Sequence, residues 1–393
     1  MKNFQKVIAK TKKHRQKILK KLAFTQKKIL TLAKSYRRQM LVRFITLEEL
    51  YGDLPKLATN DSESISTTET LQMPFYFEAQ HLQGDTYSLP PLYTITLSNF
   101  IFCARYNIIL TQFRKIISNS ISTQTDSEQF SFRALNFSRL SKLSGHYTLF
   151  RSHKNEYYHT IIDNLPRLYL LHQSEFRSLP EIRLLCAGEP TKVETFFLEK
   201  LLPDNVTPIL VNEEELFQIE HLIFPSFLSR RYAGYLPPFY LKWFLEKVAP
   251  QRSSQKNKRI FISRVQTQRG QLRCILNEDE LCETLKQYGF QKYVLEHLSI
   301  EEQIALFYDA EFVIGAHGAG LSNIIFSQKI KVLELFPIPF VLPHYYYLCK
   351  SCQHTYRYWC GQEPKRDNNF IVNVAQIEEI LDSLEQNATA FNN

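Results

Sequence analysis

The chain has 393 residues, enough for two domains of ordinary size, each with its own hydrophobic core. With 44% hydrophobic and 22% charged residues, it has the composition of a folded globular protein rather than a disordered one. The net charge of +9 comes from one end, because residues 1–43 contain fifteen Lys or Arg and no acidic residue. The remaining chain carries 33 basic and 39 acidic residues, and this acidic balance argues against a nucleic-acid groove in the body.

Two further features of the sequence bear on the cellular compartment of the protein. No apolar run approaches the roughly 18 residues of a membrane span, and nothing resembles the apolar region of a secretory signal. The seven cysteines form an odd, scattered set, which is typical of reduced thiols. We therefore expect a cytoplasmic protein.

The basic N-terminal segment shows apolar residues at helical spacing among its lysines, which predicts a helical extension over residues 1–54. One interpretation is adsorption to an anionic membrane surface, so that the protein is peripheral at the inner face of the membrane. The other is a solvated or coiled-coil helix. The apolar stripe is thin, and it does not decide between the two.

Polar stretches suggest how the rest of the chain divides. Residues 55–72 are rich in Ser and Thr and are typical of a linker, and a second polar stretch follows Pro250. We therefore predict an N-terminal α/β domain over residues 75–250 and a C-terminal domain over residues 256–393.

The C-terminal domain has a regular alternation of strand and helix patterns. Strands are predicted over 260–263, 290–295, 311–315 and 331–335, and helices over 277–289, from 299 onward and over 321–326. The first helix has an N-cap signal at Asn277 with Glu280, and the second has a capping box at Ser299 with Glu302. Strands that alternate with helices predict a parallel, doubly wound sheet.

The N-terminal domain is less regular but of the same kind. Helices are predicted over 161–172 and 192–201, and strands over 182–186 and 208–211. Between residues 75 and 150 the pattern is weak, and no element is predicted there.

The most informative segment is the turn after the third strand of the C-terminal domain. An apolar run ends at Gly315, and His317, Gly318 and Gly320 follow before a helical pattern. Glycines at such a turn allow close approach to a ligand, and the N–H groups at the start of the helix favour a phosphate. A plain tight turn explains the glycines equally well.

A second unusual segment lies in the N-terminal domain, where His159 and Asp163 are four residues apart. On a helix this spacing places both side chains on one face. Such a pair can supply a base, either as the carboxylate itself or as an imidazole that the carboxylate orients. A structural network at the start of the helix is the alternative.

Charged residues occur at two other informative places. Arg264, Arg269 and Arg273 follow the first strand of the C-terminal domain, and guanidinium groups at a strand end suit a diphosphate. They can also be solvated loop charges. Glu334 lies inside an apolar strand, where an ionised carboxylate needs an Arg or ligand hydroxyls as partners.

The cysteine spacing raises the question of a metal. Cys349 and Cys352, with His354 and Cys360 nearby, have the spacing of a zinc knuckle. The surrounding run of Tyr and Trp instead favours a packed helix and strand. No Asp-x-Asp flanked by apolar residues is present, so we expect no metal site.

Four segments, in this order, resemble glycosyltransferase family 61. They are Tyr-His-x-x-x-Asp-Asn-Leu-Pro-Arg at 158–167, Ile-Ser-Arg with Arg-x-x-x-Asn-Glu at 262–278, His-Gly-Ala-Gly-Leu-x-Asn at 317–323, and Leu-Glu-Leu-Phe-Pro at 333–337. The resemblance runs from about residue 145 to residue 360. Residues 1–75 have no counterpart in it.

The resemblance implies two Rossmann-like domains that face each other across a cleft, an arrangement of the GT-B type. It implies an inverting, metal-independent hexosyl- or pentosyltransferase that uses a nucleotide-diphosphate sugar, with a UDP-sugar as the expected donor and no other cofactor. The implied donor-binding residues are Arg264, Arg273, His317, Gly318, Ala319, Gly320, Asn323 and Glu334, with Glu334 at the ribose. Asp163 is the implied base, His159 its orienter or substitute, and Arg167 an acceptor-side residue.

The function expected from these features is transfer of a sugar to a glycan or lipid-linked acceptor in capsular or exopolysaccharide synthesis. A different class remains open, a nucleotide- or sugar-binding protein without turnover that has a membrane-binding basic tail. Nucleic-acid binding through the tail is the weakest reading, because the body is acidic.

Overall fold

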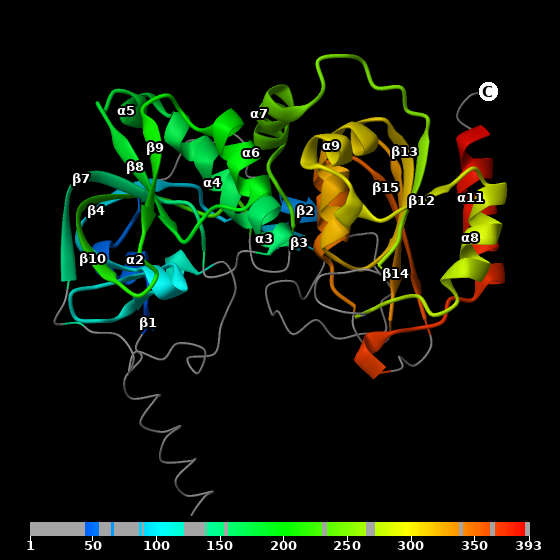
Figure 1. The fold of residues 1–393 in the computed structure, drawn as a ribbon, viewed down its shortest axis with the longest axis horizontal. Coiled ribbons are helices and arrows are strands. Elements are labelled where there is room, and N and C mark those ends of the chain that lie inside the picture. The colour runs from blue at the N-terminus through cyan, green and yellow to red at the C-terminus, as the bar shows by residue number, and fades with distance from the viewer. Residues whose placement is uncertain are drawn as a thin grey trace, which may run out of the picture.

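The computed structural model describes residues 44–54, 64–66, 86–88, 90–121, 137, 140–152, 156–229, 234–264, 272–337, 341–361 and 366–389. It contains two main β-sheets, with one layer of helices between them and a second layer outside the C-terminal sheet (Figure 1). The predicted α/β class is therefore confirmed. Of the helical extension predicted over residues 1–54, residues 1–43 lie outside the described residues, as does most of the predicted linker. Its last part contains a two-residue strand, Phe44–Ile45, and a short helix, Leu47–Tyr51.

The N-terminal sheet has eight strands in the order β1-β6-β5-β4-β10-β7-β8-β9. They are β1 (Phe44–Ile45), β4 (Thr94–Cys103), β5 (Ile108–Leu110), β6 (Ile116–Ile117), β7 (Leu140–Leu149), β8 (Ile182–Ala187), β9 (Val206–Val211) and β10 (Leu216–Pro225). Strands β10, β7, β8 and β9 pair in parallel, whereas β4 is antiparallel to both β10 and β5. The sheet is therefore mixed. A separate pair of short strands, β2 (Ser64–Ser66) and β3 (Thr86–Ser88), is antiparallel.

The helices of the N-terminal half follow β1, β7 and β8, and α7 follows β10. They are α2 (Leu47–Tyr51), α3 (Tyr157–His159), α4 (Leu165–Tyr169), α5 (Ser174–Arg177), α6 (Lys192–Leu201) and α7 (Pro238–Val248). Short 3-10 turns are η2 (Ala104–Tyr106), η3 (Ser118–Ser120) and η7 (Leu170–His172), and η6 (Thr160–Asn164) is a π-helix. Helix α6 begins and ends where the sequence predicts, since Thr191 and Glu194 form a capping box.

The C-terminal sheet has five parallel strands in the order β12-β11-β13-β14-β15. The strands are β11 (Lys258–Ile262), β12 (Gln291–Tyr293), β13 (Ala310–Ala316), β14 (Lys331–Phe336) and β15 (Thr355–Cys360). The helices are α8 (Glu278–Gln287), η8 (Leu295–His297), α9 (Ile300–Tyr308), η9 (Ala319–Phe326), α10 (His344–Ser351), η10 (Arg366–Asn368) and α11 (Val374–Thr389). The predicted parallel, doubly wound sheet is confirmed for this half.

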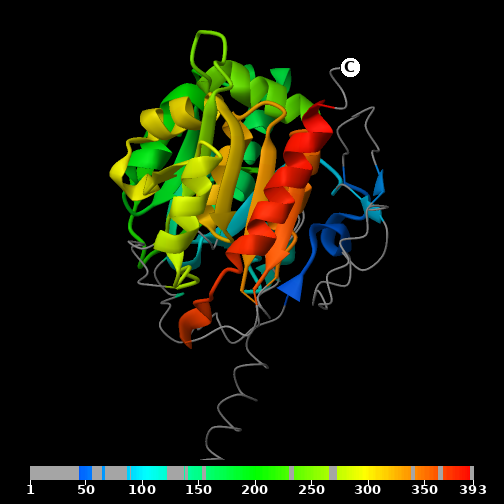
Figure 2. The same cartoon turned by 90° about the vertical axis from the view of Figure 1, so that its right-hand side faces the viewer.

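The inner faces of the two sheets share one hydrophobic core, and each outer face has a core of its own. Helices α6, α7, α9 and α10 pack between the sheets in one continuous core that includes Leu184, Phe244 and Val332. Helices α8 and α11 cover the outer face of the C-terminal sheet (Figure 2), where Leu281 and Leu381 are buried. The outer face of the N-terminal sheet packs on α2. No helix among the described residues is long and apolar enough to cross a membrane.

Side-chain caps were predicted for two helices of the C-terminal half, and one of the two is confirmed. The capping box of Ser299 and Glu302 is present at the start of α9. Asn277 precedes α8, but its side chain does not cap the helix; instead it exchanges hydrogen bonds with the backbone of Val372 and donates to Glu280. Asn277 is therefore at the predicted N-cap position, but its side chain makes no capping hydrogen bond because its amide binds the backbone of Val372.

Candidate active site

The order of the C-terminal strands fixes where a ligand can approach. In chain order the strands read 2-1-3-4-5 across the sheet, so the strand order reverses between β11 and β13. In open parallel sheets, ligands bind beyond the carboxyl ends of the strands at such a reversal. Arg264 follows β11 and His317 follows β13, so both lie at this position.

Gly318 is needed here because the backbone approaches a side chain closely. Its φ of 171° is extended and is open to any residue, but a Cβ at this position would overlap the guanidinium of Arg264. The glycine turn and Arg264 are therefore in contact. Ala319 and Gly320 begin η9, and the first N–H groups of a helix have no acceptor within it.

Arg264 itself is a half-buried cation. Within the described part of the chain it forms no ion pair, and its Nε is buried without a hydrogen-bond partner. Burial lowers the pKa of this guanidinium, which nevertheless stays charged at neutral pH. A buried unpaired charge is unfavourable in the free protein, and a bound anion would relieve it.

His317 and Glu334 form a buried pair beside this turn. His317 Nδ1 lies 2.6 Å from Glu334 Oε1, and the Tyr356 hydroxyl donates to Glu334 Oε2 at 2.7 Å. Glu334 is 0% exposed and His317 is 4% exposed. Burial lowers the pKa of His317, with a further contribution from Arg273 and Arg264, and burial raises the pKa of Glu334. Both carboxylate oxygens of Glu334 thus contact protein side chains, whereas the family resemblance implies that Glu334 contacts the ribose of the donor.

Arg273 lies on the same side of the sheet. It has a left-handed backbone with φ of 58°, and its N–H donates to the Asp367 carbonyl at 3.1 Å. Burial is the main cause of the lowered pKa of His317, and the positive charges of Arg273 and Arg264 lower that pKa further. Arg269 lies outside the described residues.

His159 and Asp163 lie in the N-terminal half and contact each other as their spacing predicts. His159 Nδ1 is 2.6 Å from Asp163 Oδ2. The predicted helix over 161–172 is interrupted here, because Pro166 has no N–H for the carbonyl of Ile162 and its ring clashes with that carbonyl. The backbone widens into the π-helix η6, a feature found frequently at functional sites.

The two His–carboxylate pairs meet through His344, the first residue of α10. Its ring centroid is 5.8 Å from that of His317 and 4.9 Å from that of Tyr158, and Tyr158 in turn lies 5.3 Å from His159. His344 was not predicted as a site residue. Nothing local distinguishes it from its aromatic neighbours, and only the docking of α10 between the halves brings it here.

Asn323 and Arg167 are held by protein contacts. The Asn323 side chain accepts a hydrogen bond from the Tyr157 hydroxyl, and it donates to Gln303 and to the Gly320 carbonyl. It therefore links the turn to the segment that carries His159. Arg167 is 1% exposed, its Nε donates to the Pro225 carbonyl at 3.0 Å, and its guanidinium lies over Phe227. Burial lowers the pKa of Arg167 to about 10.

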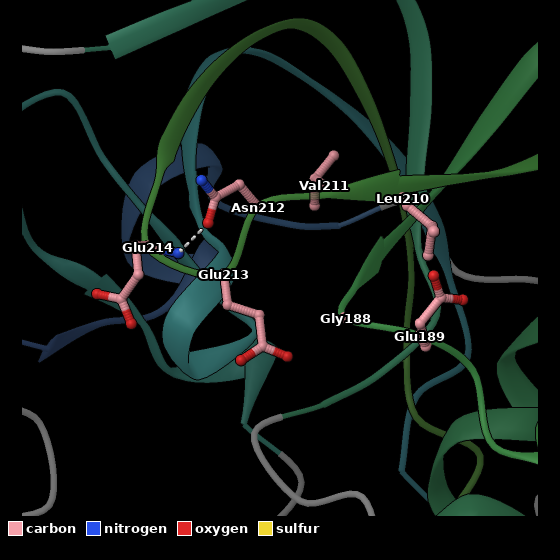
Figure 3. A pocket seen from close by; sticks show the side chains of 7 residues that line it. All are labelled: Gly188, Glu189, Leu210, Val211, Asn212, Glu213 and Glu214. Atoms are coloured by element: carbon pink, nitrogen blue, oxygen red, sulfur yellow. Dashed lines mark hydrogen bonds between the residues drawn. The ribbon is translucent and has the colours of Figure 1, made fainter.

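A pocket elsewhere contains none of these residues. It opens beyond the carboxyl ends of β8 and β9 and is lined by Gly188, Glu189, Leu210, Val211, Asn212, Glu213 and Glu214 (Figure 3). Its three carboxylates make it unsuitable for a phosphate. The zinc alternative also receives no support from the described residues, among which no three His, Cys, Asp or Glu side chains are grouped to hold a metal ion.

Comparison with known proteins finds similarity to glycosyltransferases over part of the chain. Residues 157–333 match the family described as Glycosyltransferase 61, as the sequence resemblance predicted. The matched region begins at Tyr157 and ends at Leu333, so it contains His159, Asp163, Arg264 and His317. Over 90 residues, or 19% of the chain, the protein is 29% identical to a beta-1,2-xylosyltransferase of Arabidopsis thaliana. The match spans 17% of that protein's length.

Proposed function

We propose that this protein is an inverting glycosyltransferase that moves a sugar from a nucleotide-diphosphate sugar, a UDP-sugar by expectation, to a glycan acceptor in capsular or exopolysaccharide synthesis. The observation that carries the proposal is Arg264, a half-buried guanidinium without an ion pair in the described residues, packed on Gly318 where the strand order reverses. In this proposal the C-terminal sheet binds the donor and the N-terminal half faces it in a GT-B arrangement.

Inversion is a single displacement, and the site has groups for both of its requirements. The acceptor hydroxyl attacks the anomeric carbon of the donor sugar as the bond to the diphosphate breaks. Asp163, oriented by His159, accepts the hydroxyl proton. Arg264, Arg273 and the N–H groups after Gly318 take the charge that develops on the leaving diphosphate, without a metal.

The donor site is tested with a thermal-shift panel of UDP, GDP, ADP, CDP and dTDP, with and without magnesium. A ligand at a hundredfold excess over its Kd adds about 2.7 kcal/mol to the unfolding free energy of the wild type. We expect one nucleotide to raise the Tm without magnesium, and to lose this effect in Arg264→Met.

Gly318→Ala provides an independent variant, because the added methyl group displaces the Arg264 guanidinium without requiring a new backbone conformation. It should fold normally and should also lose the nucleotide-induced shift. The control is Arg357→Met, at an exposed arginine of β15 whose Nη1 donates to the Tyr356 carbonyl, and it should keep the shift. No shift for the wild type with any nucleotide would contradict the donor site.

The charge of residues 1–43 supports a second part of the proposal, attachment of the protein to an anionic membrane surface where a lipid-linked acceptor would lie. Each Lys or Arg near such a surface contributes about 1 kcal/mol. The full chain should sediment with phosphatidylserine vesicles at low salt and not with phosphatidylcholine vesicles. Deletion of residues 1–43 should abolish sedimentation and leave nucleotide binding intact. Equal sedimentation of both proteins would show that the basic segment is not the anchor.

A further inference from the structure

A hydrogen bond joins the segment that carries His159 to the glycine turn of the C-terminal half. The hydroxyl group of Tyr157, the first residue of α3, donates to Oδ1 of Asn323 in η9. Tyr157 lies two residues before His159, and Asn323 lies three residues after Gly320. The bond therefore connects the part of the site proposed to supply the base with the part proposed to bind the donor.

The acceptor of this bond is fixed within the C-terminal half. Asn323 is 0% exposed, and its two side-chain N–H groups donate to Oε1 of Gln303 and to the carbonyl of Gly320, each at 3.1 Å. Gln303 in turn donates to the carbonyls of Leu295 and Leu298. Because Gly320 belongs to the glycine turn, Oδ1 of Asn323 is an acceptor whose position is set by that turn.

The base segment is held at both of its ends. Burial raises the pKa of Tyr157, and the hydrogen bond to Asn323 lowers it by less, so the hydroxyl stays protonated and remains a donor at neutral pH. At the end of η6, Oδ1 of Asn164 accepts a hydrogen bond from the Ser152 N–H at 2.9 Å. The segment from Tyr157 to Asn164 thus contacts the C-terminal half at its first residue and β7 of the N-terminal sheet, through the residues that follow it, at its last.

The position of Tyr157 affects where the proposed base lies. His159 follows it within α3, and Nδ1 of His159 lies 2.6 Å from Oδ2 of Asp163. A general base acts only within hydrogen-bond reach of the proton that it accepts. A displacement of about 1 Å can lower a rate about a hundredfold. A bond that sets the distance between base and donor therefore matters more for the rate than for donor affinity.

We propose that Tyr157 is a positioning residue for the transfer reaction, whose hydroxyl bond to Asn323 sets the place of the His159–Asp163 pair relative to the turn proposed to bind the donor. This inference rests on the proposed function. Tyr157 acts through Asn323 and the base segment and contacts neither substrate. Loss of its hydroxyl should slow the reaction and leave donor affinity almost unchanged, because Asn323 keeps its bonds to Gln303 and Gly320.

The test compares two variants, each of which removes only a tyrosine hydroxyl that donates to the protein. Tyr157→Phe removes the bond to Asn323. Tyr308→Phe is the control, because the Tyr308 hydroxyl donates to the Arg252 carbonyl at 2.6 Å, at the end of α9 that precedes β13, whereas the glycine turn follows β13. Calorimetry gives the Kd for UDP, and UDP release from a panel of UDP-hexoses and UDP-pentoses, with water as the acceptor, gives kcat.

We expect Tyr157→Phe to lower kcat about tenfold or more and to change the Kd for UDP less than about threefold. Tyr308→Phe should leave both quantities unchanged. A purely structural role of the Tyr157 hydroxyl predicts the same small effect in both variants, so an equal kcat in Tyr157→Phe and Tyr308→Phe would overturn the inference.

A second pair of variants tests whether the hydroxyl acts through Asn323. Asn323→Leu removes the acceptor, so adding Tyr157→Phe to it should lower kcat no further. The same loss from Tyr157→Phe in both backgrounds would mean that the hydroxyl acts on another group, and the inference would be wrong. If Asn323→Leu unfolds, the comparison of Tyr157→Phe with Tyr308→Phe decides alone.

The outcomes separate this inference from the proposed function. If the wild type binds UDP and turns over a UDP-sugar, and Tyr157→Phe does so at the full rate, the inference is wrong and the proposed function stands. If Tyr157→Phe loses UDP affinity as much as rate, the hydroxyl supports the donor site instead of the base, and the inference is also wrong. A wild type that does not bind UDP, or that binds it and turns over no UDP-sugar, contradicts both proposals.

Discussion

Asp163→Asn is expected to lower the turnover number by a factor of about 10² to 10⁴, the contribution of a positioned general base. The amide has nearly the shape of the carboxylate and can still contact His159 across the 2.6 Å contact, so the segment should stay folded. It cannot accept the proton of the acceptor hydroxyl. Affinity for the nucleotide should stay within about twofold, because Asp163 lies in the half proposed to face the acceptor.

The measurement is steady-state transfer from the donor identified by the nucleotide panel, with kcat and KM determined separately. Asp382→Asn is the matched control, because Asp382 lies exposed on α11 and accepts a hydrogen bond from Tyr288. His159→Gln distinguishes the two candidates for the base: a loss as large as that of Asp163→Asn points to a shared unit. Full activity in both variants would place the base elsewhere. A wild type that binds a nucleotide but shows no transfer would favour the binding protein without turnover.

Glu194→Ala is expected to reduce the free energy of unfolding by about 3–5 kcal/mol, the usual effect of removing one partner of a buried ion pair. Glu194 is 1% exposed and receives hydrogen bonds from both Nε and Nη2 of Arg151, at 2.9 and 2.8 Å. The same guanidinium donates to the carbonyl of Ala187, the last residue of β8, and to that of Glu189 just beyond it. Without the carboxylate, a charged group stays buried with only carbonyl partners.

Urea unfolding measures this effect, with Glu199→Ala as the control because Glu199 is exposed on the same helix. The double variant Arg151→Met with Glu194→Leu should recover much of the loss, since an apolar pair leaves no uncompensated charge. An equal loss in the single and double variants would contradict the assignment to the ion pair.

The same pair predicts a pH dependence of stability. Burial alone would raise the pKa of Glu194, but the hydrogen bonds from Arg151 and Thr191 outweigh it and hold this pKa below its usual range. A lowered pKa in the folded state contributes stability above the pKa of the unfolded chain, and that stability is lost as the pH falls through the folded-state value. Glu194→Ala should therefore lose less stability than the wild type on acidification below about pH 4.5.

The sequence predicted the C-terminal sheet well because its strands are short, apolar and separated by clear helix signals. Strand β14 and helix α9 lie within a residue or two of their predicted positions. Strands β4 and β7 were missed although each has ten residues. Both are irregular at one point: Asn99 and Gly145 have positive φ, and the register of β7 with β10 shifts beside Gly145. The shift breaks the alternation of apolar and polar residues that identifies a strand.

The candidate site was likewise predicted only where local sequence spacing determines it. The contact of His159 with Asp163 and the position of the glycine turn follow from local spacing, and the sequence predicted both. The partners of Glu334 did not follow, because His317 and Tyr356 reach it only through the pairing of neighbouring strands. Helix η9 was predicted as a helix, but its 3-10 form depends on its packing.

The aromatic contacts between the halves have a consequence for how the molecule unfolds. Phe197 of α6, Phe244 of α7 and Phe326 of η9 stack pairwise, with centroids 5.8 to 6.2 Å apart. The two sheets thus share one core, and neither half can melt without exposing rings that belong to the other. Unfolding should therefore be cooperative across the polar stretch after Pro250. If the chain were expressed as two fragments divided at this stretch, each would expose an aromatic face, and neither would be an autonomous domain.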